Sequence, residues 1–425
     1  MTNSRPSWSR ICRCGPRTSW PRPIASRSAS TPSPWSSCRT CSASGWTSTS
    51  PTTNCWNSRR LAISPSWSRS AVVREAAGPT AGRSHAASRA LSRNESPHGP
   101  LPDIVAAVAA SSRDVNRYPD PACTDLTVAL ARRHAVEPDR VAVGAGSCAL
   151  LQAVFQLAGP GATAVYAWRS FEYYPILAGH LGVHSERVPL ADDVHDLAAM
   201  ADRITATTRL VVICNPNNPT GTLLGLDRLR AFLDRVPPTC LVALDEAYFE
   251  YVDEPMGTGG LALCDRYPNL VVLRTFSKAY GLAGLRVGYL IGAARIVASL
   301  REVTLPFAVS APAQHAAVAA LALEDVLLTR VRQTIAERTR VRAALLADGF
   351  AVPASQANFL WLGLGQNAGP FGSWCARVGI ELRVFAGEGV RVSLGSPSDN
   401  DAFLAAVHQW RIRNAPELLT TGGLR

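Results

Sequence analysis

Short apolar runs alternate with stretches of helical spacing along this chain from about residue 141 onward. Each run is too short for a helix and almost continuously apolar, as expected for a strand buried on both faces of a sheet. The pattern therefore predicts an α/β fold in which a mostly parallel central sheet lies between helices. The expected strands are residues 141–143, 163–167, 210–214, 241–244, 270–273 and 287–291, and the helices between them include 150–157, 226–233 and 296–303.

A second, smaller α/β domain is expected at the C-terminal end. A long Ala-rich helical stretch runs from about Ser310 to Ala347, and two strands (359–362 and 390–394) and a last helix (402–411) follow it. We therefore divide the body into a large domain, 89–310, and a small domain, 311–425. The first residues of the large domain could instead join the small one. No run approaches 18 apolar residues, so neither a membrane-spanning helix nor a membrane partner is expected.

Residues 1–88 differ from the body in composition. The first 70 residues contain six of the ten tryptophans and five of the eleven cysteines, but no Asp, Glu, Val, Phe or Tyr. No helical or alternating apolar period runs through them. Three interpretations stay open: an Arg- and Ser-rich transit peptide, a disordered tail, and a non-globular stretch translated in the wrong frame or from a start placed too early. We favour the third, because the composition changes abruptly near residues 72–92.

The positive charge of the chain lies in this same N-terminal segment. The formal net charge is +11, yet the first 90 residues hold 13 arginines and one acid, Glu75. The rest of the chain is close to neutral, so no nucleic-acid partner is expected. The alternative is that the basic arm is functional and binds nucleic acid or another surface, in which case binding should weaken with salt.

Cysteine usage indicates free thiols and no metal site. The short spacings within Cys12, Cys14, Cys38 and Cys41 lack a periodic framework that could hold a metal ion. The six cysteines of the body are scattered, mostly in apolar runs. Such thiols are typical of a reducing compartment, so a cytoplasmic protein is expected.

Lysine usage singles out one residue. The chain contains 43 lysine and arginine residues, and only one of them, Lys278, is lysine. Such Arg-heavy usage suggests a GC-rich genome that has replaced dispensable lysines, and the survivor then does something that arginine cannot. An amine can lose its proton and form a Schiff base, whereas a guanidinium stays protonated. Because Lys278 follows an expected strand, it should lie at the mouth of the sheet, where ligands of such folds bind.

Polar residues follow other expected strands as well. The sequence DEAY ends one strand at 245–248, and NPNNPTG ends another at 215–221. The turn Gly144-Ala145-Gly146-Ser147 opens a helix whose N-terminus could hold a phosphate. A dinucleotide site would need a third small residue, for which Ala149 could serve, but that interpretation leaves Lys278 unexplained.

Together these segments resemble the fold-type I, class I and II aminotransferases, in the branch of histidinol-phosphate aminotransferases and their aromatic (phenylalanine) relatives. The resemblance covers about residues 90–412. It implies pyridoxal 5'-phosphate (PLP) as cofactor, an amino acid and a 2-oxo acid as substrates, and a homodimer with shared active sites. The segments that carry it are NESPHGP (94–100), NRYP (116–119), NPNNPTG (215–221), DEAY (245–248), SK (277–278), LAGLR (282–286), Asn358 and VRV (390–392).

The resemblance also implies which residues hold the cofactor. Lys278 binds it covalently and moves the reacting proton. Asp245 keeps the ring nitrogen protonated, so that the ring acts as an electron sink. Tyr118 reaches the phosphate from the neighbouring subunit. The remaining ring contacts are assigned to Asn218, Tyr248 and Phe171, with Trp168 as the alternative to Phe171, and the phosphate contacts to Ser147, Cys148, Thr275, Ser277 and Arg286.

The resemblance implies a substrate site but does not decide between two substrates. Arg391 matches the arginine that holds the α-carboxylate, and Asn358 supports it. Arg383 matches a position that contacts the substrate phosphate in the histidine enzymes. By contrast, Cys148 and Ala149 replace the Asp or Asn and the Glu that those enzymes often carry, and residues 166–172 are more similar to actinobacterial aromatic enzymes. We therefore expect an aromatic, phenylalanine-type substrate, with histidinol phosphate as the alternative.

Two further possibilities stay open. A PLP-dependent decarboxylase or lyase of the same fold would use the same residues, and it would release carbon dioxide or another product in place of a 2-oxo acid. A non-functional product of a damaged gene would fold poorly and would take up no cofactor.

Overall fold

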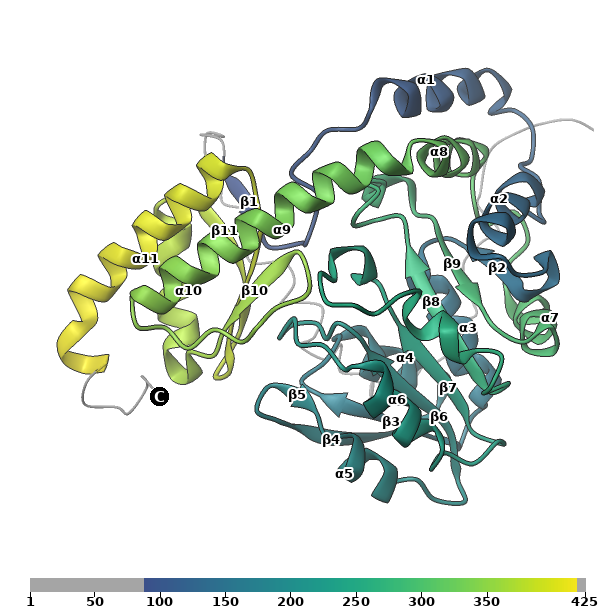
Figure 1. Cartoon of the computed structure of the whole chain (residues 1–425), viewed down its shortest axis with the longest axis horizontal. Helices are drawn as coiled ribbons and strands as arrows, with labels where there is room; N and C mark the ends of the chain where they lie inside the picture. Colours follow the sequence, from purple (N-terminus) through teal and green to yellow (C-terminus); the bar gives the residue numbers. More distant parts are fainter. Residues whose placement is uncertain (1–87, 419–425) are drawn as a thin grey trace, which may run out of the picture. The chain divides into compact units, whose positions relative to one another are not determined.

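The computed structural model describes residues 88–418, and the expectations for the N-terminal segment, including its cysteines, concern residues outside this range. Residues 88–418 form two sheets with helices packed on them (Figure 1). The expected α/β class with a mostly parallel central sheet is confirmed.

The large sheet has eight strands, six of which correspond to the expected apolar runs. Strand β4 was not predicted from the apolar pattern, because it is rich in charged and polar residues and pairs near the edge of the sheet. In spatial order the strands are β2 (Val141–Gly144), β9 (Gly288–Ile291), β8 (Leu270–Thr275), β7 (Leu241–Asp245), β6 (Thr208–Cys214), β3 (Thr163–Trp168), β4 (His184–Ala191) and β5 (Val194–His195).

Strand β9 is the main exception to the parallel arrangement. It pairs antiparallel with both β2 and β8, whereas β3, β4, β6, β7 and β8 form parallel pairs. A parallel connection needs a long crossover, usually a helix. The link from β8 to β9 contains only a short 3-10 turn, Ala283–Leu285, so the chain must return beside β8 in the opposite direction. The link, which carries Lys278, therefore stays at the carboxyl end of β8.

Helices cover both faces of the large sheet. On one face lie α3 (Ser147–Ala158), α4 (Tyr173–Leu181) and α7 (Ala294–Val303), and on the other α5 (Leu197–Asp202) and α6 (Leu226–Leu233). The sequence of β6 is continuously apolar because its side chains pack on both faces of the sheet. Val212 packs into the first of these cores, and Val211 and Ile213 pack into the second.

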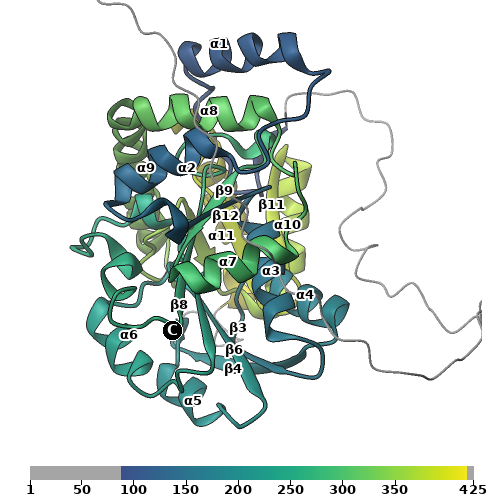
Figure 2. The same ribbon diagram turned by 90° about the vertical axis from the view of Figure 1, so that its right-hand side faces the viewer.

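A third core lies over β9. It joins that strand to α2 (Thr124–His134) and α8 (Ala311–Ala322). Helix α1 (Pro102–Ser111) lies beside α8 in two perpendicular views (Figure 2). None of the helices within residues 88–418 is long and apolar enough to cross a membrane.

The Ala-rich stretch forms two helices rather than one. Helix α8 ends at Ala322 and α9 (Glu324–Ala347) begins after Leu323, whose backbone leaves the helical region. Glu324 and Asp325 occupy the first turn of α9. Acidic residues there stabilise a helix N-terminus, which explains why a new helix starts at this point.

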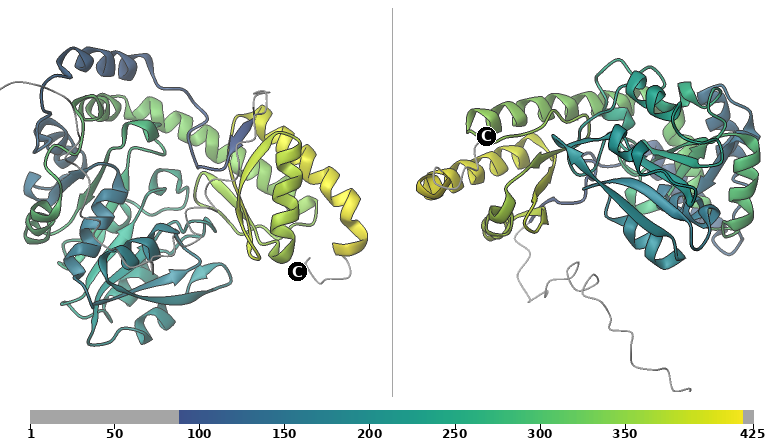
Figure 3. Two further views of the ribbon diagram at one scale, coloured as in Figure 1. Left: turned by 180° about the vertical axis from the view of Figure 1, so that it is seen from behind. Right: turned by 90° about the horizontal axis from the view of Figure 1, so that it is seen from below.

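The small sheet contains the first strand of the described chain. Its order is β1 (Arg89–Leu91), β11 (Ile380–Phe385), β12 (Gly389–Ser393) and β10 (Phe359–Leu362). The dark blue β1 lies among the yellow-green strands in Figure 3, and it pairs parallel with β11. Helices α9, α10 (Ala368–Arg377) and α11 (Pro397–Leu418) pack on one face of this sheet. The opposite face, with Phe359 and Arg391, turns toward the large sheet.

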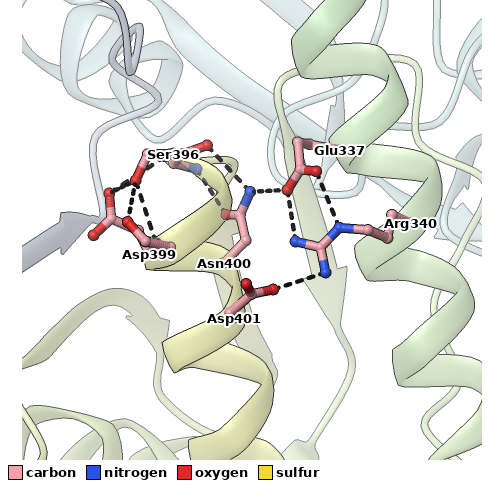
Figure 4. Close-up of polar contacts among 8 residues, drawn as sticks. Glu337, Arg340, Ser396, Asp399, Asn400 and Asp401 are labelled. Carbon is pink, nitrogen blue, oxygen red and sulfur yellow. Dashed lines mark hydrogen bonds and ion pairs between the residues drawn. The ribbon is translucent and has the colours of Figure 1, made fainter.

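A polar network holds the exit of β12 (Figure 4). Ser396 and Asp399 hydrogen-bond each other at the start of α11, as a capping box does. Buried Asn400 accepts from the amide of Gly395 at 2.9 Å and donates to Glu337 of α9 at 2.8 Å. The network thus ties the strand that carries Arg391 to the helix behind it.

Candidate active site

Lys278 lies three residues beyond the end of β8, at the mouth of the large sheet. Its Nζ atom donates a hydrogen bond of 3.0 Å to the backbone oxygen of Arg93, and the side chain is partly buried. Burial, followed by the positive charge of Arg391, lowers the pKa of this amine to about 8. The neutral, nucleophilic form of the amine is therefore much more populated near neutral pH than in an ordinary lysine.

Asp245 ends the neighbouring strand β7 and is buried. Its Oδ2 atom accepts a hydrogen bond of 2.9 Å from the hydroxyl of Tyr174, while Oδ1 has no partner within residues 88–418. Burial raises the pKa of Asp245 to about 6, although the Tyr174 bond opposes this shift. An unpartnered buried carboxylate oxygen is costly unless a ligand supplies a donor. A protonated ring nitrogen fits this requirement.

A candidate anion cradle lies where β2, β9 and β8 meet. Gly144 and Thr275 both pair with Gly288 at this edge. Gly146 has φ of 76°, and a Cβ atom there would come within 2.5 Å of the guanidinium of Arg286. A Cβ at Gly288 would come within 2.5 Å of the amide nitrogen of Ser147. Glycine therefore lets a cation and the N-terminus of α3 approach closely, as phosphate binding requires.

The hydroxyl groups of this cradle converge with the arginine. Arg286 donates to Oγ of Ser277 at 3.2 Å, and Oγ1 of Thr275 accepts from the amide of Ser277 at 3.1 Å. Cys148, in the first turn of α3, responds to the charges of Asp245, Arg286 and Lys278, and burial raises its pKa. The structure thus brings the residues expected to hold the phosphate together with the amine and the carboxylate.

Arg391 connects the small sheet to the NPNNPTG loop. It donates to Oδ1 of Asn218 and to the backbone oxygen of Ser92, each at 2.6 Å. Its Nε atom has no partner among the described residues, and burial lowers its pKa. Asn358 donates to the backbone of Asn94 at 3.1 Å. A buried guanidinium with a free donor is suited to binding a carboxylate.

Asn94 also bridges the two sides of the site. Its amide donates to the hydroxyl of Tyr248 at 3.0 Å, and its Oδ1 accepts from Ser393 of β12 at 2.9 Å. Sequence reasoning placed Asn94 within a carrying segment but gave it no role. It also missed Tyr174, because no spacing in the sequence links a residue of α4 to the end of β7.

The two candidate stacking aromatics have different surroundings. The Phe171 ring is partly buried and packs edge-on against Tyr174, with ring centroids 5.6 Å apart, which places it beside the partner of Asp245. The Trp168 ring instead lies under the guanidinium groups of Arg169 and Arg187, at 4.4 and 4.7 Å. This geometry favours Phe171 as the residue that faces a ring in the site.

Two expected residues make other contacts in this chain. The Tyr118 side chain is 84% exposed and packs on Phe307, with ring centroids 4.8 Å apart, so it joins none of the contacts described above. Arg383 forms an ion pair with Glu172, a residue that sequence reasoning did not single out.

A reactive amine, an unpaired buried carboxylate and an anion cradle at the carboxyl edge of this α/β sheet define a PLP-dependent enzyme of fold type I. Residues 90–404 match the model for "Aminotransferase class I and II", and the chain belongs to this family. It is accordingly a PLP-dependent transaminase, which acts on an amino acid and a 2-oxo acid.

Several named proteins are similar to this chain. An aromatic amino acid aminotransferase of Thermobifida fusca is 55% identical over 76% of this chain and 90% of its own length. One of Streptomyces avermitilis is 49% identical over 79% of this chain and 92% of its own length.

Several solved structures are also similar to this chain. A histidinol-phosphate aminotransferase of Sinorhizobium meliloti, in complex with PLP, has a TM-score of 0.70 and 30% identity and covers 76% of this chain and 90% of its own. An L-threonine-O-3-phosphate decarboxylase of Porphyromonas gingivalis, at 23% identity over 76% of this chain and 99% of its own, shares the fold with a TM-score of 0.65.

Proposed function

We propose that this enzyme transfers the amino group of an aromatic, phenylalanine-type amino acid to a 2-oxo acid. The observation that carries the proposal is the 46–55% identity to relatives named aromatic amino acid aminotransferase. Trp361, which pairs with Arg391 across β10 and β12, and Phe385 are buried and lie edge to face on the small sheet, with ring centroids 5.4 Å apart.

Bound PLP supplies an electron sink for the carbanion that forms at the substrate Cα. In this proposal Nζ of Lys278 holds the cofactor and afterwards carries the proton from Cα. Oδ1 of Asp245 would accept a hydrogen bond from the protonated ring nitrogen, and the Tyr174 bond keeps that carboxylate in place. Phe171 would stack on the ring, and Asn218 and Tyr248 would hydrogen-bond its phenolic oxygen.

Anionic groups have two separate places in the proposed site. Ser147, Cys148, Thr275, Ser277 and Arg286 would hold the cofactor phosphate. The α-carboxylate of the substrate lies against Arg391, whose partners Asn218 and Ser92 hold the guanidinium plane, while Asn358 supports the neighbouring backbone. Separate sites for the two anions would restrict how the substrate can be oriented relative to Lys278.

We also propose a cytoplasmic homodimer in which Tyr118 reaches the phosphate of the neighbouring subunit. Tyr118 and Leu305 are 84% and 80% exposed, and Val115 is 74% exposed, so a second copy would cover apolar surface here. The six cysteines of the described residues are free thiols, five of them buried, which suits a reducing compartment.

Histidinol phosphate remains the second candidate substrate, because Arg383 matches a phosphate-contacting position and the Sinorhizobium structure is of that enzyme. A decarboxylase is the third. The test is the absorption spectrum of the purified protein, borohydride reduction with peptide mapping, and product assays. We expect a yellow protein, a label on Lys278, and 2-oxo acid formed from phenylalanine without carbon dioxide. Uptake of no PLP, or a preference for histidinol phosphate, contradicts the proposal.

A further inference from the structure

Arg383 and Arg391 lie directly opposite each other on the antiparallel strands β11 and β12. Residues in this relation point to the same face of a sheet, with Cβ atoms about 5 Å apart. Arg383 therefore stands beside the arginine proposed to bind the α-carboxylate. It lies within reach of groups that a substrate carries beyond that carboxylate.

Glu172 forms an ion pair with the guanidinium group of Arg383. The two Oε atoms of Glu172 accept from Nη2 at 2.7 and 2.9 Å, and Oε2 also accepts from Nε at 3.2 Å. Glu172 follows Phe171 directly and precedes α4, so the large-sheet side of the site supplies the negative charge and the small sheet the positive one. The side chains are 39% and 36% exposed, which leaves both accessible to a ligand.

Both members of this pair act on Arg391. Burial is the largest influence on the Arg391 pKa, but Glu172 raises that pKa and Arg383 lowers it. A second ion pair, Arg169–Glu388, lies nearby, because Arg169 and Arg383 both approach the Phe385 ring. Arg383 lies directly opposite Arg391 in the strand pairing, whereas Arg169 and Glu388 lie outside the strands. The two pairs are thus chemically alike but differ in their position relative to the carboxylate-binding arginine.

We propose that Glu172 is a specificity-determining residue, which pairs with Arg383 and so withholds a positive charge from the substrate side chain. An unpaired arginine beside Arg391 would attract amino acids with an anionic side chain. The ion pair as a whole carries no net charge, and the Arg383 guanidinium lies over the Phe385 ring, 5.6 Å from its centroid. The site therefore prefers an uncharged aromatic side chain. This inference rests on the proposed function and names the residue that excludes anionic substrates.

The test compares substrates that share a shape and differ in charge. In the PLP-loaded full-length enzyme, kcat/KM is measured for 4-carboxyphenylalanine and for 4-carbamoylphenylalanine, its neutral analogue. We expect Glu172→Gln to raise the carboxy-to-carbamoyl ratio by about 3- to 10-fold, the range of partly exposed charge pairs. The matched control Glu388→Gln breaks the second pair and should leave the ratio within about twofold.

Two further measurements distinguish an effect of charge on binding from an effect on folding. Calorimetry with 3-(4-carboxyphenyl)propanoate, which has no amino group and cannot react, should show tighter binding to Glu172→Gln, and added salt should reduce the gain. Arg383→Gln leaves Glu172 uncompensated, and the carboxy-to-carbamoyl ratio should then fall below that of the wild type.

The outcomes distinguish this inference from the proposed function. An unchanged ratio in Glu172→Gln, or an equal rise in Glu388→Gln, overturns the role of Glu172 even if phenylalanine is a good substrate. If the wild type does not accept aromatic amino acids while Glu172→Gln binds the dianion more tightly, the proposed function fails and the role of Glu172 stands.

Discussion

The hydroxyl of Tyr174 donates a hydrogen bond to Oδ2 of Asp245, while Oδ1 of the same carboxylate has no partner among residues 88–418. The bond lowers the pKa of Asp245, against the larger effect of burial, which raises it to about 6. Tyr174 is itself fully buried. Tyr174 thus acts in two ways: it orients the carboxylate, and it favours the ionised form that a protonated ring nitrogen requires.

Tyr174→Phe should weaken cofactor binding most strongly at low pH. Without the hydroxyl the Asp245 pKa rises above about 6, and a neutral Asp245 lacks the negative charge that keeps the ring nitrogen protonated. We expect the Kd for PLP to rise by about 3- to 10-fold at pH 6.5 and by less at pH 8, where Asp245 is ionised in both proteins. Fluorescence titration of the apoenzyme measures this. Tyr173→Phe, which keeps the ring and removes the hydroxyl of a partly buried neighbour in α4, should have no effect, and a pH-independent loss in Tyr174→Phe would contradict the mechanism.

The lowered pKa of Lys278 should appear in the rate of PLP uptake. Only the neutral amine attacks the aldehyde, so the rate constant for the apoenzyme should rise with pH, reach half its maximum near pH 8 and level off above. An ordinary lysine would titrate near pH 10.4. Stopped-flow absorbance gives the profile. A rate that climbs steadily to pH 10 would show that the amine is unperturbed, and Lys278→Arg should take up no borohydride label at any pH.

Gly146→Ala should damage the phosphate cradle. The new Cβ would lie 2.5 Å from Nη2 of Arg286, and φ of 76° disfavours any side chain. Arg286 must then move away from α3. We expect the Kd for PLP to increase by about tenfold or more, because the phosphate loses contacts. Pyridoxal, which lacks the phosphate, should lose much less affinity. Gly284→Ala is the control, because a Cβ there meets nothing within 4 Å; equal losses in the two variants would refute the cradle.

Arg391→Lys should raise KM for the amino acid more than it lowers kcat. A lysine cannot make the two simultaneous bonds to Asn218 and Ser92 and still present a planar donor pair to a carboxylate. We expect KM to rise by about 10- to 100-fold, with PLP affinity retained because the cradle is untouched. Steady-state kinetics with phenylalanine measures both constants. The exposed Arg377 provides the control substitution, Arg377→Lys, which should behave as the wild type.

Much of the fold could be predicted from local pattern. The continuous apolar runs of β2, β3, β6, β7, β8 and β9 are a direct consequence of burial on two faces, and that burial is what the structure shows. Strands β4 and β11 could not be found in this way, because polar and charged residues interrupt their apolar pattern. The direction of β9 also lay beyond local pattern, since it depends on a short connection rather than on composition.

The sequence alone determined the expected chemistry, because its single lysine follows a strand and the segments around the site resemble those of the aminotransferases. Tertiary structure alone decided which atoms are left free. Tyr174 satisfies one oxygen of Asp245 and not the other, and Glu172 pairs with an arginine 211 residues away along the chain. Such pairings arise when separate strands and helices meet at one sheet edge, and no spacing within the sequence encodes them.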